Sequence, residues 1–279
     1  MDVETLISGH SAQISGMKTN YLDEGTGAPV VLVHGSGPGV SAFANWERTI
    51  PVLAKHFRVI APDLAGFGLT IPPNDVTYGL DLWTNHLVGL LDRLGIERAS
   101  FVGNSFGGGI ALALAVRFPE RVERLMLMGT AGLDYVPPIY PRVDPAIGLT
   151  GEVMKQLARR FTYYPDSITD GMVQLRLDTM KATGGMAREG RMFPGNPRLS
   201  RVSVMATPAQ LITEIKSPTL LVHGRDDQIM PPSISLRLNE LIENSDLHLF
   251  ARCGHWSQLD RFDEFNALAI AFFNAGKEQ

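Results

Sequence analysis

The chain has 279 residues, of which 44% are hydrophobic and 19% charged, a balance typical of a globular protein with a sizeable core. Its 25 Lys and Arg against 29 Asp and Glu give a net charge of −4, which argues against a surface for nucleic acid or anionic membranes. The one cysteine, Cys253, excludes an internal disulfide and a cysteine-rich zinc site.

The N-terminal segment, residues 1–13, lacks the basic start and apolar run of a secretory signal. The longest apolar run, residues 110–116, is far shorter than the ~18–20 residues that span a membrane. We therefore expect a cytoplasmic protein with no membrane partner, and the lone thiol fits a reducing compartment.

Short apolar, β-branched runs alternate with helix-like segments through the first half of the chain. This alternation predicts an α/β fold, with a mostly parallel, doubly wound sheet covered by helices on both faces. The expected strands cover residues 29–34, 57–61, 99–102, 122–128, 219–223 and 246–250. The expected helices of this part cover residues 80–94 and 108–118.

The pattern changes between residues 134 and 212. A proline-rich entry is followed by helical periodicity in residues 154–161 and 168–180, and then by a Gly- and Pro-rich stretch, residues 184–197. No strand stands out in this segment. We expect a helical cap or lid, residues 134–212, inserted into one core made of residues 1–133 and 213–279.

The strongest chemical signal is the pentapeptide Gly103-Asn104-Ser105-Phe106-Gly107, between an expected strand and an expected helix. It has the G-x-S-x-G pattern of a nucleophile elbow, a sharp turn that exposes a serine hydroxyl. The turn crowds the backbone, so the positions two residues either side of the serine need glycine. The pattern predicts Ser105 as a nucleophile; the alternative is an ordinary Gly-rich turn.

A serine nucleophile needs a base, and the base needs an acid to orient it. Asp227 follows one C-terminal strand and His255 follows the next, which is the chain order expected after such an elbow. We favour Asp227, four residues before Pro231, as the acid, and Asp226 stays an alternative. The other interpretation of His255 is a capping or core histidine.

Acyl chemistry also needs hydrogen-bond donors for a developing oxyanion. The backbone N–H of Phe106 is one candidate, and the glycine-rich loop of residues 34–39 is expected to supply the other. The glycines match neither a dinucleotide nor a phosphate loop, and no cluster has metal-ligand spacing, so we expect no cofactor and no metal. His34, His223 and Cys253 are expected to be structural.

The elbow, the His-Gly turn, HGRDDQIMP and GHW resemble the α/β-hydrolase superfamily. Four longer stretches resemble, more narrowly, the meta-cleavage product hydrolases. They are HGSGPGVSAFANW, APDLAGFG, VGNSFGGGIALALA and RCGHWSQLDR. Enzymes of this family hydrolyse a carbon–carbon bond in 2-hydroxy-6-oxohexa-2,4-dienoates during bacterial degradation of aromatic compounds. The resemblance implies the α/β-hydrolase fold, a small-molecule dienoate substrate and a homo-oligomer. It leaves open whether Ser105 forms an acyl-enzyme or His255 activates water.

The resemblance also implies roles for residues around the triad. Asn45 and Asn104 would be polar contacts to the dienoate head, and Ser36 or Gly37 would give the second oxyanion-hole N–H.

Two further residues complete the implied site. Trp256 would line the pocket, and Arg176 would bind the substrate carboxylate, which suits a planar bidentate donor. The alternative for Arg176 is a surface charge on an amphipathic helix.

A carboxylesterase with the same triad would need no such arginine. A ligand-binding receptor built on this fold would keep the triad and turn over slowly.

Overall fold

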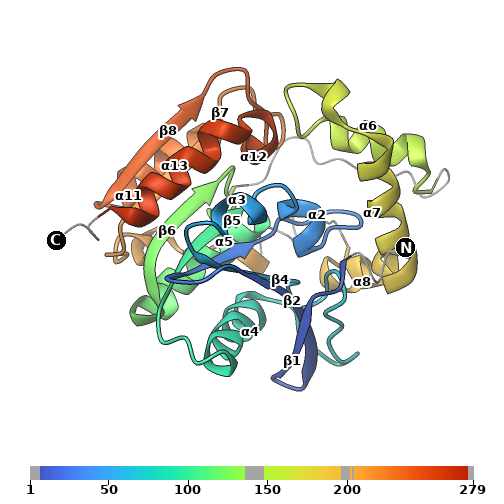
Figure 1. Ribbon diagram of the computed structural model, residues 1–279, viewed down its shortest axis with the longest axis horizontal. Coiled ribbons are helices and arrows are strands. Elements are labelled where there is room, and N and C mark those ends of the chain that lie inside the picture. Colours follow the sequence, from blue (N-terminus) through green and yellow to red (C-terminus); the bar gives the residue numbers. More distant parts are fainter. Residues whose placement is uncertain (1–6, 136–147, 196–201, 203, 276–279) are drawn as a thin grey trace.

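A computed structural model describes residues 7–135, 148–195, 202 and 204–275, and its centre is an eight-stranded sheet (Figure 1). The strand order is β1-β2-β4-β3-β5-β6-β7-β8. Strands β3 to β8 run parallel, while β2 pairs antiparallel with both β1 and β4. The prediction of a mostly parallel sheet is therefore confirmed. The strands are β1 (His10–Ile14), β2 (Met17–Glu24), β3 (Pro29–Val33), β4 (Arg58–Pro62), β5 (Ala99–Asn104), β6 (Val122–Met128), β7 (Thr219–Gly224) and β8 (Ser245–Phe250).

The hairpin of β1 and β2 is the part of the sheet that the sequence interpretation missed. Its two-residue turn consists of Ser15 and Gly16, with φ of 48° and 79°. Positive φ at both central residues matches the twist of a tight hairpin. The six other strands lie within a residue or two of their expected positions.

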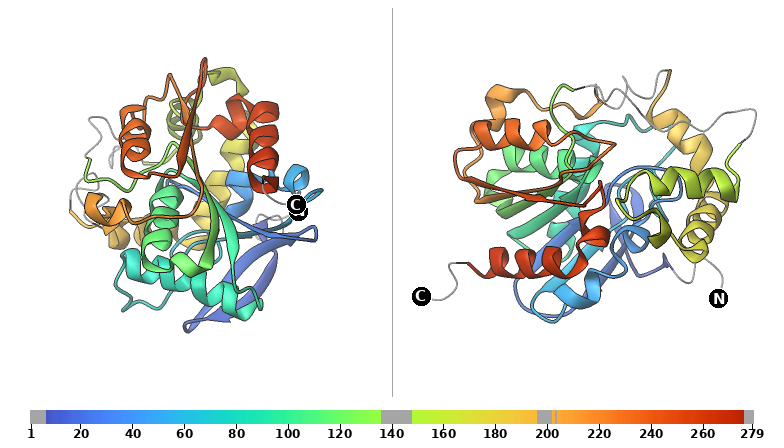
Figure 2. Two further views of the ribbon diagram at one scale, coloured as in Figure 1. Left: turned by 90° about the vertical axis from the view of Figure 1, so that its left-hand side faces the viewer. Right: turned by 90° about the horizontal axis from the view of Figure 1, so that it is seen from above.

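Helices cover both faces of the sheet, as the left view of Figure 2 shows for α11 and α13. Alternate residues of β3 enter two separate cores: Val31 and Val33 face one, Val30 and Leu32 the other. The first core packs against α4 (Leu80–Arg93), α5 (Phe106–Arg117), α10 (Ala209–Ile212) and α11 (Ser233–Leu241). The second packs against α2 (Ala42–Trp46), α3 (Ile50–Leu53) and α13 (Phe262–Asn274).

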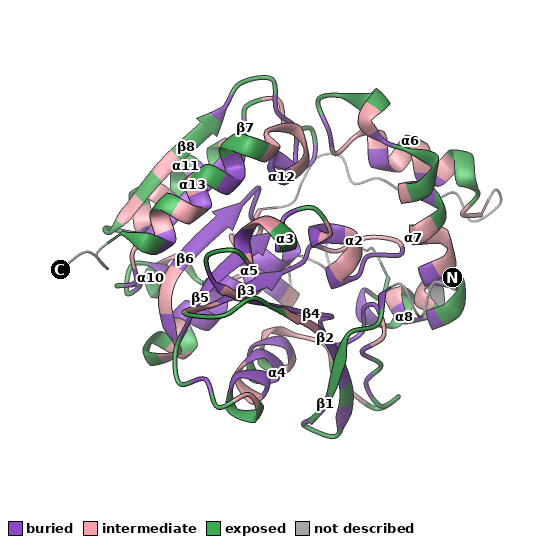
Figure 3. Ribbon diagram, in the orientation of Figure 1, coloured by how far each residue is buried: buried purple, intermediate pink, exposed green. Residues whose placement is uncertain are grey.

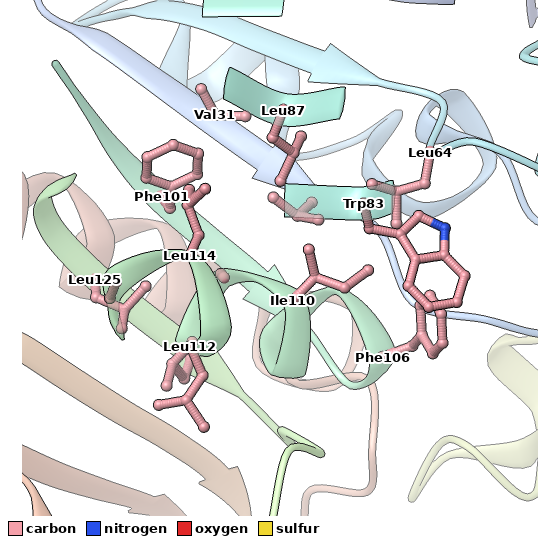
Figure 4. Close-up of a cluster of buried hydrophobic side chains, with 14 of the residues drawn as sticks. Val31, Leu64, Trp83, Leu87, Phe101, Phe106, Ile110, Leu112, Leu114 and Leu125 are labelled. Carbon is pink, nitrogen blue, oxygen red and sulfur yellow. The ribbon is translucent and has the colours of Figure 1, made fainter. Parts of the chain in front are cut away.

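Helix α5 is buried along nearly its whole length, from Phe106 to Ala115. A helix that is apolar all round belongs inside a protein, and α5 contacts β3, β5 and β6 of the sheet as well as its neighbour α4. Figure 3 shows the buried residues gathered in the middle of the sheet. The α5 residues Phe106 and Ile110 approach Trp83 and Leu87 of α4 (Figure 4). This packing fixes the start of α5, where the elbow serine lies.

Within residues 148–195, the described part after the first core segment, the α-helices are α6 (Gly151–Arg159), α7 (Asp170–Thr183) and α8 (Gly185–Met192). The side chains of Thr150 and Thr169 cap α6 and α7 by accepting hydrogen bonds from backbone N–H groups three residues on. Helices α6 and α7 share a small apolar cluster with Trp256, which follows β8. The proline-rich entry lies mostly outside the described residues, and the cap boundaries at 134 and 212 stay a prediction. Within the described part of the chain, no helix is both long and apolar enough to cross a membrane.

Candidate active site

The turn between β5 and α5 holds Ser105 at a φ of 52°, which is rare for a residue other than glycine. A Cβ at Gly103 would lie 2.5 Å from the Cα of Gly108, and one at Gly107 would lie 2.3 Å from the Val33 carbonyl oxygen. Side chains cannot fit at either position, for the reason that the sequence pattern indicated. The crowded backbone lifts Ser105 out of the strand and places it at the N-terminus of α5.

Asp227 and His255, from the loops after β7 and β8, form a buried pair. The distance from Asp227 Oδ2 to His255 Nδ1 is 2.7 Å. The other carboxylate oxygen, Oδ1, accepts hydrogen bonds from the amides of Ile229 and Met230 at 2.7 and 2.9 Å. Because the carboxylate only accepts, the proton of this hydrogen bond lies on His255 Nδ1, and in the neutral ring the lone pair of Nε2 is available to a reacting group.

Charge and hydrogen bonding keep Asp227 ionised despite its burial. Burial alone would raise its pKa, but the attraction of His255 and hydrogen bonds from His223 and His255 hold the pKa well below its usual range. His255 Nε2 is buried and has no hydrogen-bond partner, so the Ser105 hydroxyl is not bonded to it in this structure. Such contacts are often long in ligand-free enzymes and tighten when substrate binds.

Asp226, the alternative acid, points to a different partner. Its Oδ2 accepts a hydrogen bond from the Cys253 amide at 3.4 Å and lies 3.8 Å from Arg225 Nη2. The structure therefore pairs Asp227, not Asp226, with the histidine.

His223 contacts the loop that carries Asp227. Its Nε2 lies 2.9 Å from the Met230 carbonyl oxygen and 3.2 Å from Asp227 Oδ2. Both neighbours only accept, so Nε2 carries the proton and Nδ1 accepts from the Ser235 hydroxyl at 2.7 Å. These bonds give His223 a positioning role, in line with the sequence expectation.

His34 anchors the glycine-rich loop after β3. Its Nε2 accepts a hydrogen bond from the Leu64 amide at 3.0 Å, so Nδ1 carries the proton and donates to the Gly35 carbonyl at 2.7 Å. Burial lowers the pKa of His34 to about 4, which keeps the ring neutral. The Gly35 amide in turn donates to Asn45 Oδ1 at 3.3 Å.

The same loop lies against the elbow, where an oxyanion hole is expected. A Cβ on Gly35 would lie 2.9 Å from Asn104 Oδ1. The Phe106 amide stands in the first turn of α5, where backbone N–H groups have no partner within the helix and carry partial positive charge. These positions suit donors to an oxyanion formed above Ser105. The choice between Ser36 and Gly37 as the second donor stays a prediction.

Arg176 is a buried residue of α7, only 8% exposed, which rules out the alternative of a surface charge. Its Cζ lies 5.1 Å from the Trp256 ring centre, and its Nη1 donates to the Pro38 carbonyl at 3.3 Å. Burial lowers the pKa of Arg176 to about 10, so it stays charged at neutral pH. Arg176, Trp256 and Asn45 line one small cavity, whose lining does not include Ser105 or His255. Asn104 lies apart from that cavity lining, at the elbow.

Three residues of this region escaped the sequence interpretation. Phe161, just after α6, packs edge-on to His255 with ring centres 5.4 Å apart and stacks on Trp256. Gly129, after β6, lies so close that a Cβ there would be 3.0 Å from His255 Nδ1. Gln258 lines the cavity of Arg176. Only Gly129 carried a signal, a glycine at the end of a predicted strand.

Cys253 has no reactive surroundings. Its side chain is fully buried, and burial raises the pKa of the thiol to about 12. No group of three or more His, Cys, Asp or Glu side chains within the described ranges could hold a metal ion.

The chain is similar to known proteins over nearly its whole length. The sequence matches the alpha/beta hydrolase fold family over residues 28–166 and 205–262. It is 44% identical to a 2-hydroxy-6-oxo-2,4-heptadienoate hydrolase of Pseudomonas putida, over 96% of both chains. It is also 44% identical to a 2-hydroxymuconate semialdehyde hydrolase of Pseudomonas sp., over 95% of this chain and 93% of that one.

Solved structures agree with the sequence matches. A variant of the meta-cleavage product hydrolase CumD from Pseudomonas fluorescens IP01, complexed with acetates, superposes with a TM-score of 0.90 at 44% identity. The match covers 96% of this chain and 98% of that one. The 2-hydroxy-6-oxo-6-phenylhexa-2,4-dienoate hydrolase of Rhodococcus sp. strain RHA1 gives a TM-score of 0.82 at 29% identity, covering 95% and 98%.

Proposed function

The chain belongs to the alpha/beta hydrolase fold family and, within it, to the meta-cleavage product hydrolases, and from that premise we propose its substrate and mechanism. The substrate is a 2-hydroxy-6-oxohexa-2,4-dienoate or a relative substituted at the distal carbonyl. The products are 2-hydroxypenta-2,4-dienoate and a carboxylic acid. The relatives of known activity act on substrates of this class.

Cleavage begins at the carboxylate end of the substrate. Arg176, Asn45 and Asn104 bind the carboxylate and the 2-hydroxyl group. The hydroxyl proton moves to C5 and leaves a 2-oxo group, so that an electron pair released at C5 can be delocalised. Arg176 is suited to this because it is charged, buried and stacked against Trp256.

An oxygen nucleophile then attacks the distal carbonyl, C6. His255 takes the proton of that nucleophile, which is the Ser105 hydroxyl in an acyl-enzyme route or water in a direct route. The amides of Phe106 and of Ser36 or Gly37 stabilise the oxyanion. The C5–C6 bond breaks, its electron pair passes into a dienolate that takes up a proton, and one water is consumed overall.

The observation that carries this proposal is the combination of two buried groups in one structure. His255, whose Nδ1 lies 2.7 Å from Asp227 Oδ2, supplies a base. The buried Arg176 supplies a cation for the substrate carboxylate. An ordinary esterase needs the first and has no use for the second.

The test is a spectroscopic assay with a yellow dienoate. Wild-type protein should bleach the dienoate, while Ser105→Ala and Asp227→Asn should bleach it at least ~10³-fold more slowly. Asp226→Asn is the matched control and should stay within a few-fold of wild type. Rapid turnover of p-nitrophenyl esters without bleaching would contradict the proposal and favour a carboxylesterase. A fast steady-state rate on any substrate would argue against a receptor.

We also propose that the protein works as a homo-oligomer in the cytoplasm. The family resemblance supports the assembly, and the single buried thiol fits a reducing compartment. Light scattering of the purified protein would give a mass above that of one 30.5 kDa chain if the assembly forms.

A further inference from the structure

The cavity beside Arg176 collects polar atoms that have no partner. It lies between α2, α7 and the short helix α12 (Ser257–Asp260). Among the residues described, eleven buried side-chain nitrogen or oxygen atoms lack a hydrogen bond, and three belong to side chains that line this cavity. They are Asn45 Nδ2, Thr49 Oγ1 and Gln258 Oε1. Folded proteins pair almost all such atoms, so this concentration points to a polar ligand.

Gln258 has a defined orientation in the wall of the cavity. The residue is only 7% exposed, and its amide nitrogen donates to the Asn45 carbonyl oxygen at 3.4 Å. A carbonyl can only accept, so the nitrogen must be the atom at that end of the amide. The opposite atom, Oε1, is therefore an acceptor that has no donor.

Asn45 shows the complementary arrangement. Its Oδ1 accepts a hydrogen bond from the Gly35 amide at 3.3 Å, which leaves Nδ2 as a donor without a partner. Beside the Arg176 guanidinium, the cavity thus presents one unpaired donor, Asn45 Nδ2, and one unpaired atom that can only accept, Gln258 Oε1. The Thr49 hydroxyl can donate or accept, and the charged residues Glu47 and Arg48 also line the cavity. A carboxylate can accept hydrogen bonds from Asn45 Nδ2 and Arg176, and a hydroxyl group beside that carboxylate can donate to Gln258 Oε1.

We propose that Gln258 accepts a hydrogen bond from the 2-hydroxyl group of the substrate and so selects acids that carry a hydroxyl beside the carboxylate. The inference rests on the proposed function, because the 2-hydroxydienoate head has this pair of groups. An acid without the hydroxyl leaves Oε1 buried and unpaired, and sites built to bond a hydroxyl reject analogues that lack it. Thr49 is the competing candidate, since its hydroxyl can also accept.

Equilibrium binding to the full chain separates these roles. The probes are 2-hydroxyhexanoate and hexanoate, which differ in the hydroxyl and cannot be cleaved, titrated by calorimetry. Wild type should bind the hydroxy acid about 10-fold more tightly. Gln258→Met keeps the length of the side chain but removes the acceptor. In this variant the Kd values of the two acids should lie within about twofold of each other, and the Kd of hexanoate should change little from wild type. Thr49→Val is the matched control and should keep the preference.

Three results would overturn the role of Gln258. They are an equal loss for both acids in Gln258→Met, a preference that survives in that variant, or a preference that disappears in Thr49→Val. If Gln258→Met does not fold, as judged by its circular dichroism, a wild type without any preference still refutes the inference.

Failure of the proposed function would look different from failure of this inference. A wild type that cleaves no dienoate, yet prefers the hydroxy acid through Gln258, contradicts the reaction and supports the hydroxyl contact. If the wild type cleaves dienoates but Gln258→Met still prefers the hydroxy acid, the result supports the reaction and contradicts the contact between Gln258 and the hydroxyl group.

Discussion

Gly129 lies against the Asp227–His255 pair, and its replacement by alanine tests whether the geometry of that pair governs activity. Its φ is 50°, where alanine costs about 1–2 kcal/mol relative to an ordinary conformation. The new Cβ would lie 3.0 Å from His255 Nδ1 and 3.4 Å from Asp227 Oδ2. The imidazole would have to shift by a few tenths of an ångström, and misplacement on this scale should lower kcat about 10-fold or more.

Gly95→Ala is the matched control for the backbone cost alone. Gly95 has a φ of 67°, and nothing lies within 4 Å of a Cβ built there. Both variants should lose about 1–2 kcal/mol in urea unfolding, but only Gly129→Ala should lose kcat on a dienoate. Full activity in Gly129→Ala, at the same loss of stability as Gly95→Ala, would refute the reasoning.

Three further predictions concern stability. Burial lowers the pKa of His86 from 6.5 to about 4. As the pH falls, His86 is therefore protonated in the unfolded chain before it is protonated in the folded protein, which favours unfolding. Between pH 7 and pH 5, wild type should therefore lose about 2 kcal/mol more unfolding free energy than His86→Gln, and parallel losses would contradict this. Arg188 is 4% exposed and leaves Nε and Nη1 unpartnered, so Arg188→Met should leave urea stability unchanged or raise it; a loss above about 2 kcal/mol would count against that. Asp260 accepts hydrogen bonds from the amides of Gly254 and Tyr163, at 2.7 and 2.8 Å, and so joins the cap to the loop of His255. Asp260→Ala should cost about 2 kcal/mol, and an unchanged melting temperature would show that this link is not needed.

The parts of the fold that the sequence predicted are those with local causes. The buried parallel strands appear as short β-branched runs closed by turn residues, and the elbow needs glycine where the backbone is crowded. The acid and the base were placed by their order after successive strands. The hairpin of β1 and β2 was missed although its signal was present, since Ser15-Gly16 is a two-residue turn between alternating segments.

Other features depend on contacts between distant segments. Helix α8 forms within a stretch read only as rich in Gly and Pro, and its last residue, Met192, is buried in the main core. Helix propensity alone would not predict it, because tertiary packing supplies most of the stability of such short helices. The contacts of Phe161 with His255 and of Gln258 with Asn45 join residues from separate elements, so no local pattern could reveal them.

The central claim is that this protein hydrolyses a carbon–carbon bond, and product stoichiometry tests it most directly. Wild-type protein incubated with 2-hydroxy-6-oxohepta-2,4-dienoate should release one acetate and one 2-hydroxypenta-2,4-dienoate for each dienoate consumed. Loss of the yellow colour without acetate would contradict the claim, because it would mean that the dienoate was isomerised or bound rather than cleaved.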